Sequence, residues 1–128
     1  MVALERILYA EDESDIQHVA SLALEMVGGY NLKTCNSGLE AVADIEAFVP
    51  QLLLFDVMMP DMDGSTALTK IRELEAFKDT PAIFMTAKVQ PNEVQGYLDM
   101  GAVDVIAKPF DPMTLASQIQ DIWARVQG

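Results

Sequence analysis

The sequence predicts an α/β fold in which a parallel sheet of five strands carries helices on both faces. Five short apolar runs, typical of buried strands, alternate along the chain with five segments of helical periodicity. Strict alternation favours parallel strands joined by right-handed crossovers, which place helices on both faces of the sheet. The chain has 128 residues, the length of one domain, and shows no linker or internal repeat. We therefore expect residues 1–128 to form a single, doubly wound, three-layer sandwich.

The expected strands are apolar runs that stop at polar or turn residues. The third is continuously apolar, as in a strand buried on both faces of a sheet. The second is weaker, because polar and apolar residues alternate along it. The five expected ranges are 6–10, 31–36, 52–55, 81–85 and 103–107.

The expected helices begin at capping residues or proline and stop at glycine or proline. Ser14 with Gln17, and Ser37 with Glu40, each match the spacing of a capping box. Pro112 suits the first turn of the last helix. The five expected ranges are about 14–27, 37–49, 65–75, 91–100 and 112–126.

Composition excludes several classes of protein. Hydrophobic residues make up 51% of the chain, which indicates a globular protein, and the net charge of −12 disfavours nucleic acid and anionic membranes as partners. No apolar run reaches the roughly 20 residues of a membrane helix, and the first ten residues do not resemble a signal peptide. Cys35, the only cysteine, excludes an internal disulfide and is expected to be a core residue. We expect a cytoplasmic protein.

Polar residues follow four of the five expected strands. Glu11 and Asp12 end the first strand, Asp56 the third, Thr86 the fourth and Lys108 the fifth. The carboxyl ends of parallel strands lie at one edge of the sheet, which is where ligands bind in open α/β folds. The three carboxylates converge there if the first and third strands are neighbours.

Converging carboxylates need a positive partner. Two like charges about 4 Å apart repel by about 4 kcal/mol at an effective dielectric constant of roughly 20. A cation that prefers oxygen ligands and keeps bound water, such as Mg²⁺, suits this set. Asp56 would retain one oxygen as a nucleophile, while Lys108 and the Thr86 hydroxyl, expected on the far side, would stabilise a phosphoryl group in transfer.

The polar residues at the strand ends belong to four motifs. These are Ile-Leu-Tyr-Ala-Glu-Asp-Glu at 7–13, Asp-Val-Met-Met-Pro-Asp-Met-Asp-Gly at 56–64, Phe-Met-Thr-Ala-Lys at 84–88 and Lys-Pro-Phe at 108–110. In this order along the chain, they resemble one known family, the receiver domains of two-component response regulators, which are CheY-like proteins. The resemblance covers essentially the whole chain. It implies the flavodoxin-like strand order 2-1-3-4-5 and a phosphoacceptor signalling domain that is not classed as an enzyme.

The resemblance also implies residue roles and partners. Asp56 would accept a phosphoryl group from a histidine kinase or a histidine phosphotransfer protein. Glu11, Asp12, Asp56 and the backbone carbonyl of Met58 would bind Mg²⁺. A downstream protein would dock on the last two helices and the last strand.

Thr86 and Lys108 resemble the switch hydroxyl and the invariant lysine of the family, and the peptide bond before Pro109 would be cis. Val105 departs from the pattern, because many receivers carry an aromatic residue three positions before the lysine. The aromatic half of the usual switch is therefore missing. Met58 and Lys88 occupy variable positions that we expect to tune the lifetime of the phosphoryl group.

Three other functions are alternatives to this one. A Mg²⁺ phosphohydrolase with an aspartate nucleophile would need a second Asp as general acid, and Met58 stands at that position. An adaptor of the same fold that is never phosphorylated would have no need of the acidic pair, Thr86 and Lys108. A flavin-binding protein is disfavoured, because no Ser/Thr/Gly-rich loop follows the first strand.

Overall fold

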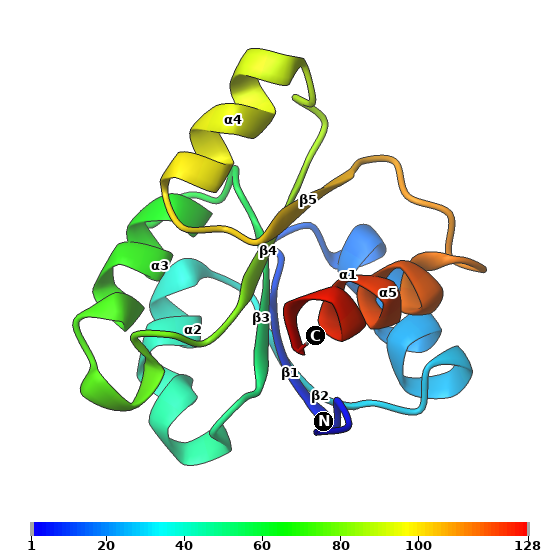
Figure 1. Ribbon diagram of the computed structural model, residues 1–128. Coiled ribbons are helices and arrows are strands. Elements are labelled where there is room, and N and C mark those ends of the chain that lie inside the picture. The colour runs from blue at the N-terminus through cyan, green and yellow to red at the C-terminus, as the bar shows by residue number, and fades with distance from the viewer. Residues whose placement is uncertain (1, 128) are drawn as a thin grey trace.

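The computed structural model describes residues 2–127 and shows one five-stranded parallel sheet in the order β2-β1-β3-β4-β5, as predicted (Figure 1). The central strands β1, β3 and β4 are buried almost throughout, which explains why they read as continuous apolar runs. The strands are β1 (Arg6–Ala10), β2 (Asn31–Cys35), β3 (Leu52–Asp56), β4 (Ala82–Thr86) and β5 (Asp104–Ala107).

Helices cover both faces of the sheet. Helices α1 and α5 lie on one face, while α2, α3 and α4 lie on the other (Figure 1). The last turn of the first helix widens into a π-helix, η1, and a short 3₁₀-helix, η2, follows α3. The bounds are α1 (Ser14–Leu22), η1 (Ala23–Val27), α2 (Gly38–Phe48), α3 (Gly64–Arg72), η2 (Glu75–Phe77), α4 (Pro91–Asp99) and α5 (Leu115–Gln127).

Alternating side chains divide the core into two layers. Tyr9 and Leu54 belong to the layer between the sheet and helices α1 and α5. Leu8, Phe55 and Cys35 belong to the layer beneath α2 and α3. The two layers follow from the two-residue period of a strand, and the prediction of a buried Cys35 is confirmed.

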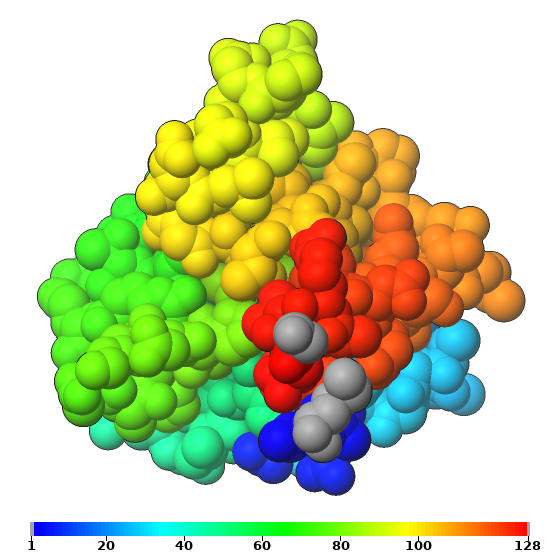
Figure 2. All heavy atoms as spheres, in the orientation of Figure 1, coloured from blue at the N-terminus to red at the C-terminus, as the bar shows by residue number. Residues whose placement is uncertain are grey.

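Helix α4 is the least embedded helix. None of its residues is buried, and Figure 2 shows it, in yellow, standing out from the body of the protein. Its main aromatic contact is Tyr97, whose ring meets Phe84 of β4 edge to face at a centroid distance of 5.7 Å. Within residues 2–127, the helices lack the length and apolar character required to cross a membrane.

One predicted helix cap and two predicted helix starts differ from the observed ones. Ser14 is the first residue of α1 and not its cap, so the capping box with Gln17 is wrong. Helix α3 begins at Gly64, where the Asp63 carboxylate accepts the N–H of Thr66 at 2.8 Å. Helix α5 begins at Leu115, because Asp111 holds a turn before it. By contrast, Ser37 caps α2 as predicted.

Helix α3 also ends earlier than predicted. The Arg72 guanidinium donates to the carbonyl oxygens of Phe77 and Thr80 at 2.9 and 2.6 Å. These bonds fix a reversal of the chain that the apolar periodicity up to residue 75 did not reveal.

Gly64 brings the loop after β3 back against the strand. Its N–H donates to the carbonyl of Val57 at 3.0 Å, and a Cβ at this position would overlap the carbonyl oxygen of Asp56. A larger residue therefore has to displace the backbone that carries Asp56.

We expect Gly64→Ala to lower the free energy of unfolding by about 1–3 kcal/mol, because overpacking forces the backbone to shift. Gly96→Ala is the matched control: no atom lies within 4 Å of its Cβ position on α4, so it should stabilise by up to about 1 kcal/mol. Urea denaturation measures both. Equal effects of the two substitutions would contradict the proposed tight approach.

Candidate functional site

Three carboxylates meet at the carboxyl ends of β1 and β3. Glu11, Asp12 and Asp56 each offer one oxygen, and these oxygens lie within 4.8 Å of one another. They converge because β1 and β3 are neighbours at the point where the strand order reverses, where open α/β sheets form a crevice. Asp12 is exposed, whereas Glu11 and Asp56 are buried.

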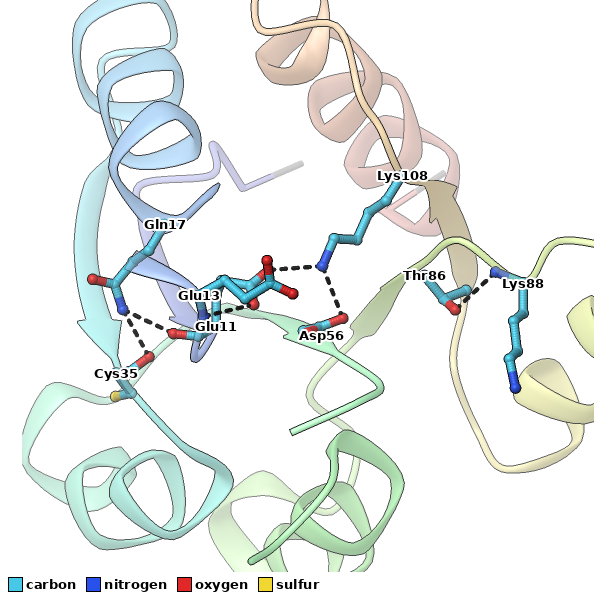
Figure 3. Close-up of polar contacts among 8 residues, drawn as sticks. All are labelled: Glu11, Glu13, Gln17, Cys35, Asp56, Thr86, Lys88 and Lys108. Atoms are coloured by element: carbon cyan, nitrogen blue, oxygen red, sulfur yellow. Dashed lines mark hydrogen bonds and ion pairs between the residues drawn. The ribbon is translucent and has the colours of Figure 1, made fainter. Parts of the chain in front are cut away.

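Lys108 enters the same cluster from the end of β5. Its Nζ lies 2.9 Å from Oε1 of Glu11 and 3.2 Å from Oδ1 of Asp56 (Figure 3). Only 13% of the Lys108 side chain is exposed, so solvent screens these contacts weakly. The Lys108–Pro109 peptide is cis, as predicted. The contact with Glu11 is new, since the sequence placed Lys108 only on the far side of Asp56.

Burial and charge act in opposite directions on this ion-paired group. Burial raises the pKa of Glu11, and the charge of Asp56 adds to this effect, which together outweigh the hydrogen bond from Lys108. Burial alone would lower the pKa of Lys108, but the hydrogen bond to Glu11 and the charge of Asp56 raise it above its ordinary value. Lys108 is therefore a firmly protonated cation between two carboxylates, one of which takes up a proton more readily than usual.

Backbone contacts fix Glu11 in place. The N–H of Glu13 donates to its Oε2 at 3.2 Å, and its own N–H continues the β1–β2 ladder by donating to the Cys35 carbonyl at 3.1 Å. Gln17 ties the same corner, because its Nε2 donates to the Glu11 carbonyl at 2.9 Å and to Oδ1 of Asn36 at 2.8 Å. The sequence had assigned Gln17 to a helix cap, so this role was missed.

Thr86 ends β4 and is almost fully buried. Its Oγ1 accepts the backbone N–H of Lys88 at 3.1 Å, and Figure 3 shows the hydroxyl directed at Lys88 and away from Asp56. The structure therefore places Thr86 at the predicted edge, with its hydroxyl engaged by the following loop.

The loop between β3 and α3 carries Met58, Asp61 and Asp63. Met58 is 64% exposed. Asp61 adopts a left-handed conformation with φ of 67°, as suits a turn residue, and Asp63 caps α3. Neither joins the carboxylate cluster. His18 is exposed on α1.

A groove of about 590 Å³ opens beside the cluster. Asp56 and Lys108 line it from the sheet, and most of the remaining lining is apolar. It lies between α1 and the loop that follows β5. The apolar lining residues are Ile16, Val19, Met58, Ala87, Pro109 and Phe110. The sequence did not predict this groove, because its walls come from four separate segments.

Val105, the departure noted in the sequence, lies half-buried in β5 opposite Phe84 of β4. The aromatic pair nearest to it along the sheet is Phe84 with Tyr97 of α4. Tyr97 is thus partly a core residue, whereas its neighbour Leu98 is exposed.

Comparison with known proteins places this geometry in one family. Residues 7–120 match the response regulator receiver domain. Response regulator Rre1 of Synechocystis sp. is 31% identical over 123 residues, covering 95% of this chain and 53% of that protein. The DNA-binding dual master transcriptional regulator RpaA of the same organism is 32% identical over 123 residues, covering 95% of this chain and 50% of that protein. The chain spans about half the length of these curated relatives.

Among solved structures, the chemotaxis protein CheY4 of Vibrio cholerae superimposes with a TM-score of 0.86 at 29% identity, covering 94% of this chain and 99% of that chain. The strand order, the acidic cluster at the switch point and these similarities all agree. The chain therefore belongs to the receiver domains of two-component response regulators.

Proposed function

We propose that Asp56 is the phosphoacceptor of this receiver and that a histidine kinase or a histidine phosphotransfer protein is the donor. The observation that carries the proposal is the position of Asp56: it ends the central strand, beside Lys108 and two further carboxylates. One Asp56 oxygen contacts Lys108 at 3.2 Å, and its side chain also lines the groove next to the cluster.

In the proposed transfer, a carboxylate oxygen of Asp56 forms a bond to phosphorus while the P–N bond to the donor imidazole breaks. The bonding electrons return to the imidazole nitrogen. Lys108 stabilises the charge on the transferring phosphoryl oxygens, as fixed cations do in phosphoryl transfer. In the proposed loss of the phosphoryl group, water attacks phosphorus, the bond between phosphorus and the Asp56 oxygen breaks, and the carboxylate and inorganic phosphate are released. The domain thus promotes its own modification without acting on a separate substrate.

The acidic cluster fits Mg²⁺. Its three oxygens are hard ligands within 4.8 Å of one another, and Asp12 is exposed, which leaves room for bound water. Glu11, Asp12, Asp56 and the carbonyl of Met58 would hold the ion. When bound, Mg²⁺ neutralises charge on the phosphoryl group and on the carboxylates around it.

Thr86 and Lys108 would act as the switch. Phosphorylation adds negative charge and strong acceptor oxygens at Asp56. Lys108 then gains a stronger partner than Glu11, and the Thr86 hydroxyl, whose oxygen accepts the Lys88 N–H here, turns to donate its proton to a phosphoryl oxygen. With Val105 in place of an aromatic residue, we propose that the change reaches α4 through the β4–α4 loop and the Phe84–Tyr97 contact, and alters a docking surface formed by α4, β5 and α5.

The groove supports docking of the donor beside Asp56. A phosphohistidine has to reach Asp56 at the edge of the sheet, and the apolar walls beside it can bury side chains that flank the histidine. The acidic rim, which includes Glu13 and Asp15, favours a donor with basic residues around that patch.

We expect incubation with acetyl phosphate and Mg²⁺ to add one phosphoryl group to the parent protein and none to Asp56→Asn. The amide is close in shape to the carboxylate but is a poor nucleophile. Intact-mass spectrometry measures the adduct, and omission of Mg²⁺ should abolish it. A second assay offers phosphorylated histidine proteins as donors, for a domain that does not accept acetyl phosphate. Absence of an adduct in both assays, or an adduct on Asp56→Asn, would refute the role of Asp56.

Asp12→Asn should weaken Mg²⁺ binding about tenfold or more, because it removes one anionic ligand from the set. Isothermal titration calorimetry measures the change. Asp61→Asn is the matched control, since it removes a nearby charge that lies outside the cluster. Comparable losses in both variants would show that the ion responds to general negative charge and not to this site.

Lys108→Met should reduce the free energy of unfolding at neutral pH by about 3–5 kcal/mol, because it leaves two buried carboxylates unpaired. The raised pKa of Glu11 means that the folded state takes up a proton before the unfolded state does. The loss of unfolding free energy relative to the parent should therefore become smaller as the pH falls through the raised pKa of Glu11 toward its ordinary value of 4.5. Denaturation over a pH series tests this.

The exposed Lys88→Met serves as control for the Lys108 variant. It removes the same charge within the same region, but its side chain does not join the ion-paired group, so we expect a change near zero. A pH-independent deficit in Lys108→Met would show that the loss comes from packing of the lysine stem.

A further inference from the structure

The hydroxyl of Tyr9 is buried without a hydrogen-bond partner. Tyr9 has no exposed surface, and its OH is the buried side-chain polar atom that lacks a partner among residues 2–127. A phenylalanine would fill the same space without this penalty, because an unpaired buried hydroxyl costs free energy. A hydrogen-bond partner gained in another state of the protein would offset this cost.

Tyr9 lies in β1, just before the strand end that carries part of the carboxylate cluster. It precedes Glu11 by two residues, and it pairs across the sheet with Leu54, which precedes Asp56 by two residues. Residues two apart on a strand share a face and are separated by about 7 Å. The phenol thus lies in the core layer beneath α1 and α5, and its residue is two positions before Glu11 along β1 and level with the residue two positions before Asp56.

Electrostatics agree with this placement. Burial raises the pKa of Tyr9 most strongly, and the charges of Glu11 and Asp56 raise it further. Tyr9 consequently remains a neutral phenol, which can donate one hydrogen bond. The negative charge above it makes a carboxylate oxygen its natural acceptor.

Glu11 loses a donor in the proposed phosphorylated state. Its Oε1 accepts from Lys108 and its Oε2 from the N–H of Glu13. Mg²⁺ in the cluster would take one of the two Glu11 oxygens. If Lys108 turns toward a phosphoryl group on Asp56, the other oxygen needs a new donor. A buried carboxylate oxygen without a donor is costly, which would oppose the movement of Lys108.

We propose that the Tyr9 hydroxyl is the replacement donor, which hydrogen-bonds Glu11 when Lys108 engages the phosphoryl group. Tyr9 is then a positioning residue: it holds the Glu11 carboxylate and lowers the cost of moving Lys108. The inference rests on the proposed phosphorylation of Asp56, and it assigns a function to a hydroxyl that the unphosphorylated fold does not use.

The test compares the parent, Tyr9→Phe and Tyr30→Phe, each with Mg²⁺ and beryllofluoride as the phosphoryl mimic. Tyr9→Phe without ligands should melt at the parent temperature or above it, because no hydrogen bond is lost. Its affinity for beryllofluoride should fall about tenfold, the size of one hydrogen bond to a charged group. Tyr30→Phe, which loses a hydroxyl bond to Gln120 far along the chain, should bind as the parent does.

A spectroscopic readout separates this role from simple packing. Beryllofluoride should shift the near-ultraviolet absorption of tyrosine in the parent and in Tyr30→Phe, as a phenol gains a charged acceptor. The shift should be smaller in Tyr9→Phe than in the parent, where only the contribution of Tyr97, whose contact with Phe84 the proposed switch also changes, remains.

The outcomes distinguish the two proposals. If the parent fails to bind beryllofluoride, the proposed function falls and this inference with it. If the parent binds and Tyr9→Phe binds equally well, only the inference is overturned. A lower melting temperature for unliganded Tyr9→Phe would also overturn it, because the hydroxyl would then already have a partner in that state.

Discussion

The ion pair of one lysine with two buried carboxylates is the interaction on which this structure depends. Lys108 comes from the last strand, Glu11 from the end of the first and Asp56 from the end of the third, so the contact exists only when the whole sheet is assembled. Without the lysine, two neighbouring acids would face each other in a poorly solvated site. The fold holds this arrangement of charges in place. The surrounding backbone, from the Glu13 N–H to the Gly64 turn, keeps the two acids from moving away from it.

The same arrangement explains how a small chemical change can act on a large part of the domain. The lysine is shared between two acids, so a stronger anion at Asp56 in the proposed phosphorylated state would redistribute its contacts. The Thr86 hydroxyl, at the end of the neighbouring strand, accepts a backbone N–H of the adjacent loop. That loop leads into α4, whose one aromatic contact with the sheet is Tyr97 on Phe84. In the proposed switch, a rearrangement at the strand ends would reach the least embedded helix by a short route.

Sequence reasoning recovered the five strands and the residues at their carboxyl ends, because apolar runs and the polar residues that stop them are local signals. The strand order came from resemblance, since composition does not say which strands are neighbours. Gln17 was misassigned because the capping-box spacing from Ser14 is identical whether or not Ser14 takes the cap conformation. The Lys108–Glu11 contact joins residues 97 positions apart, and the groove has walls from four segments, so neither leaves a local pattern.

Helix α4 has no buried residue, and this has a consequence for its energetics. Segments with few buried contacts open locally at a free-energy cost well below that of global unfolding, and they exchange their amide hydrogens correspondingly faster. The helix should thus sample displaced positions continuously while the sheet stays closed. The proposed phosphorylation of Asp56 would then have only to change the populations of positions that α4 already visits, and a differential stabilisation of about 5.5 kcal/mol would invert even a 99:1 population.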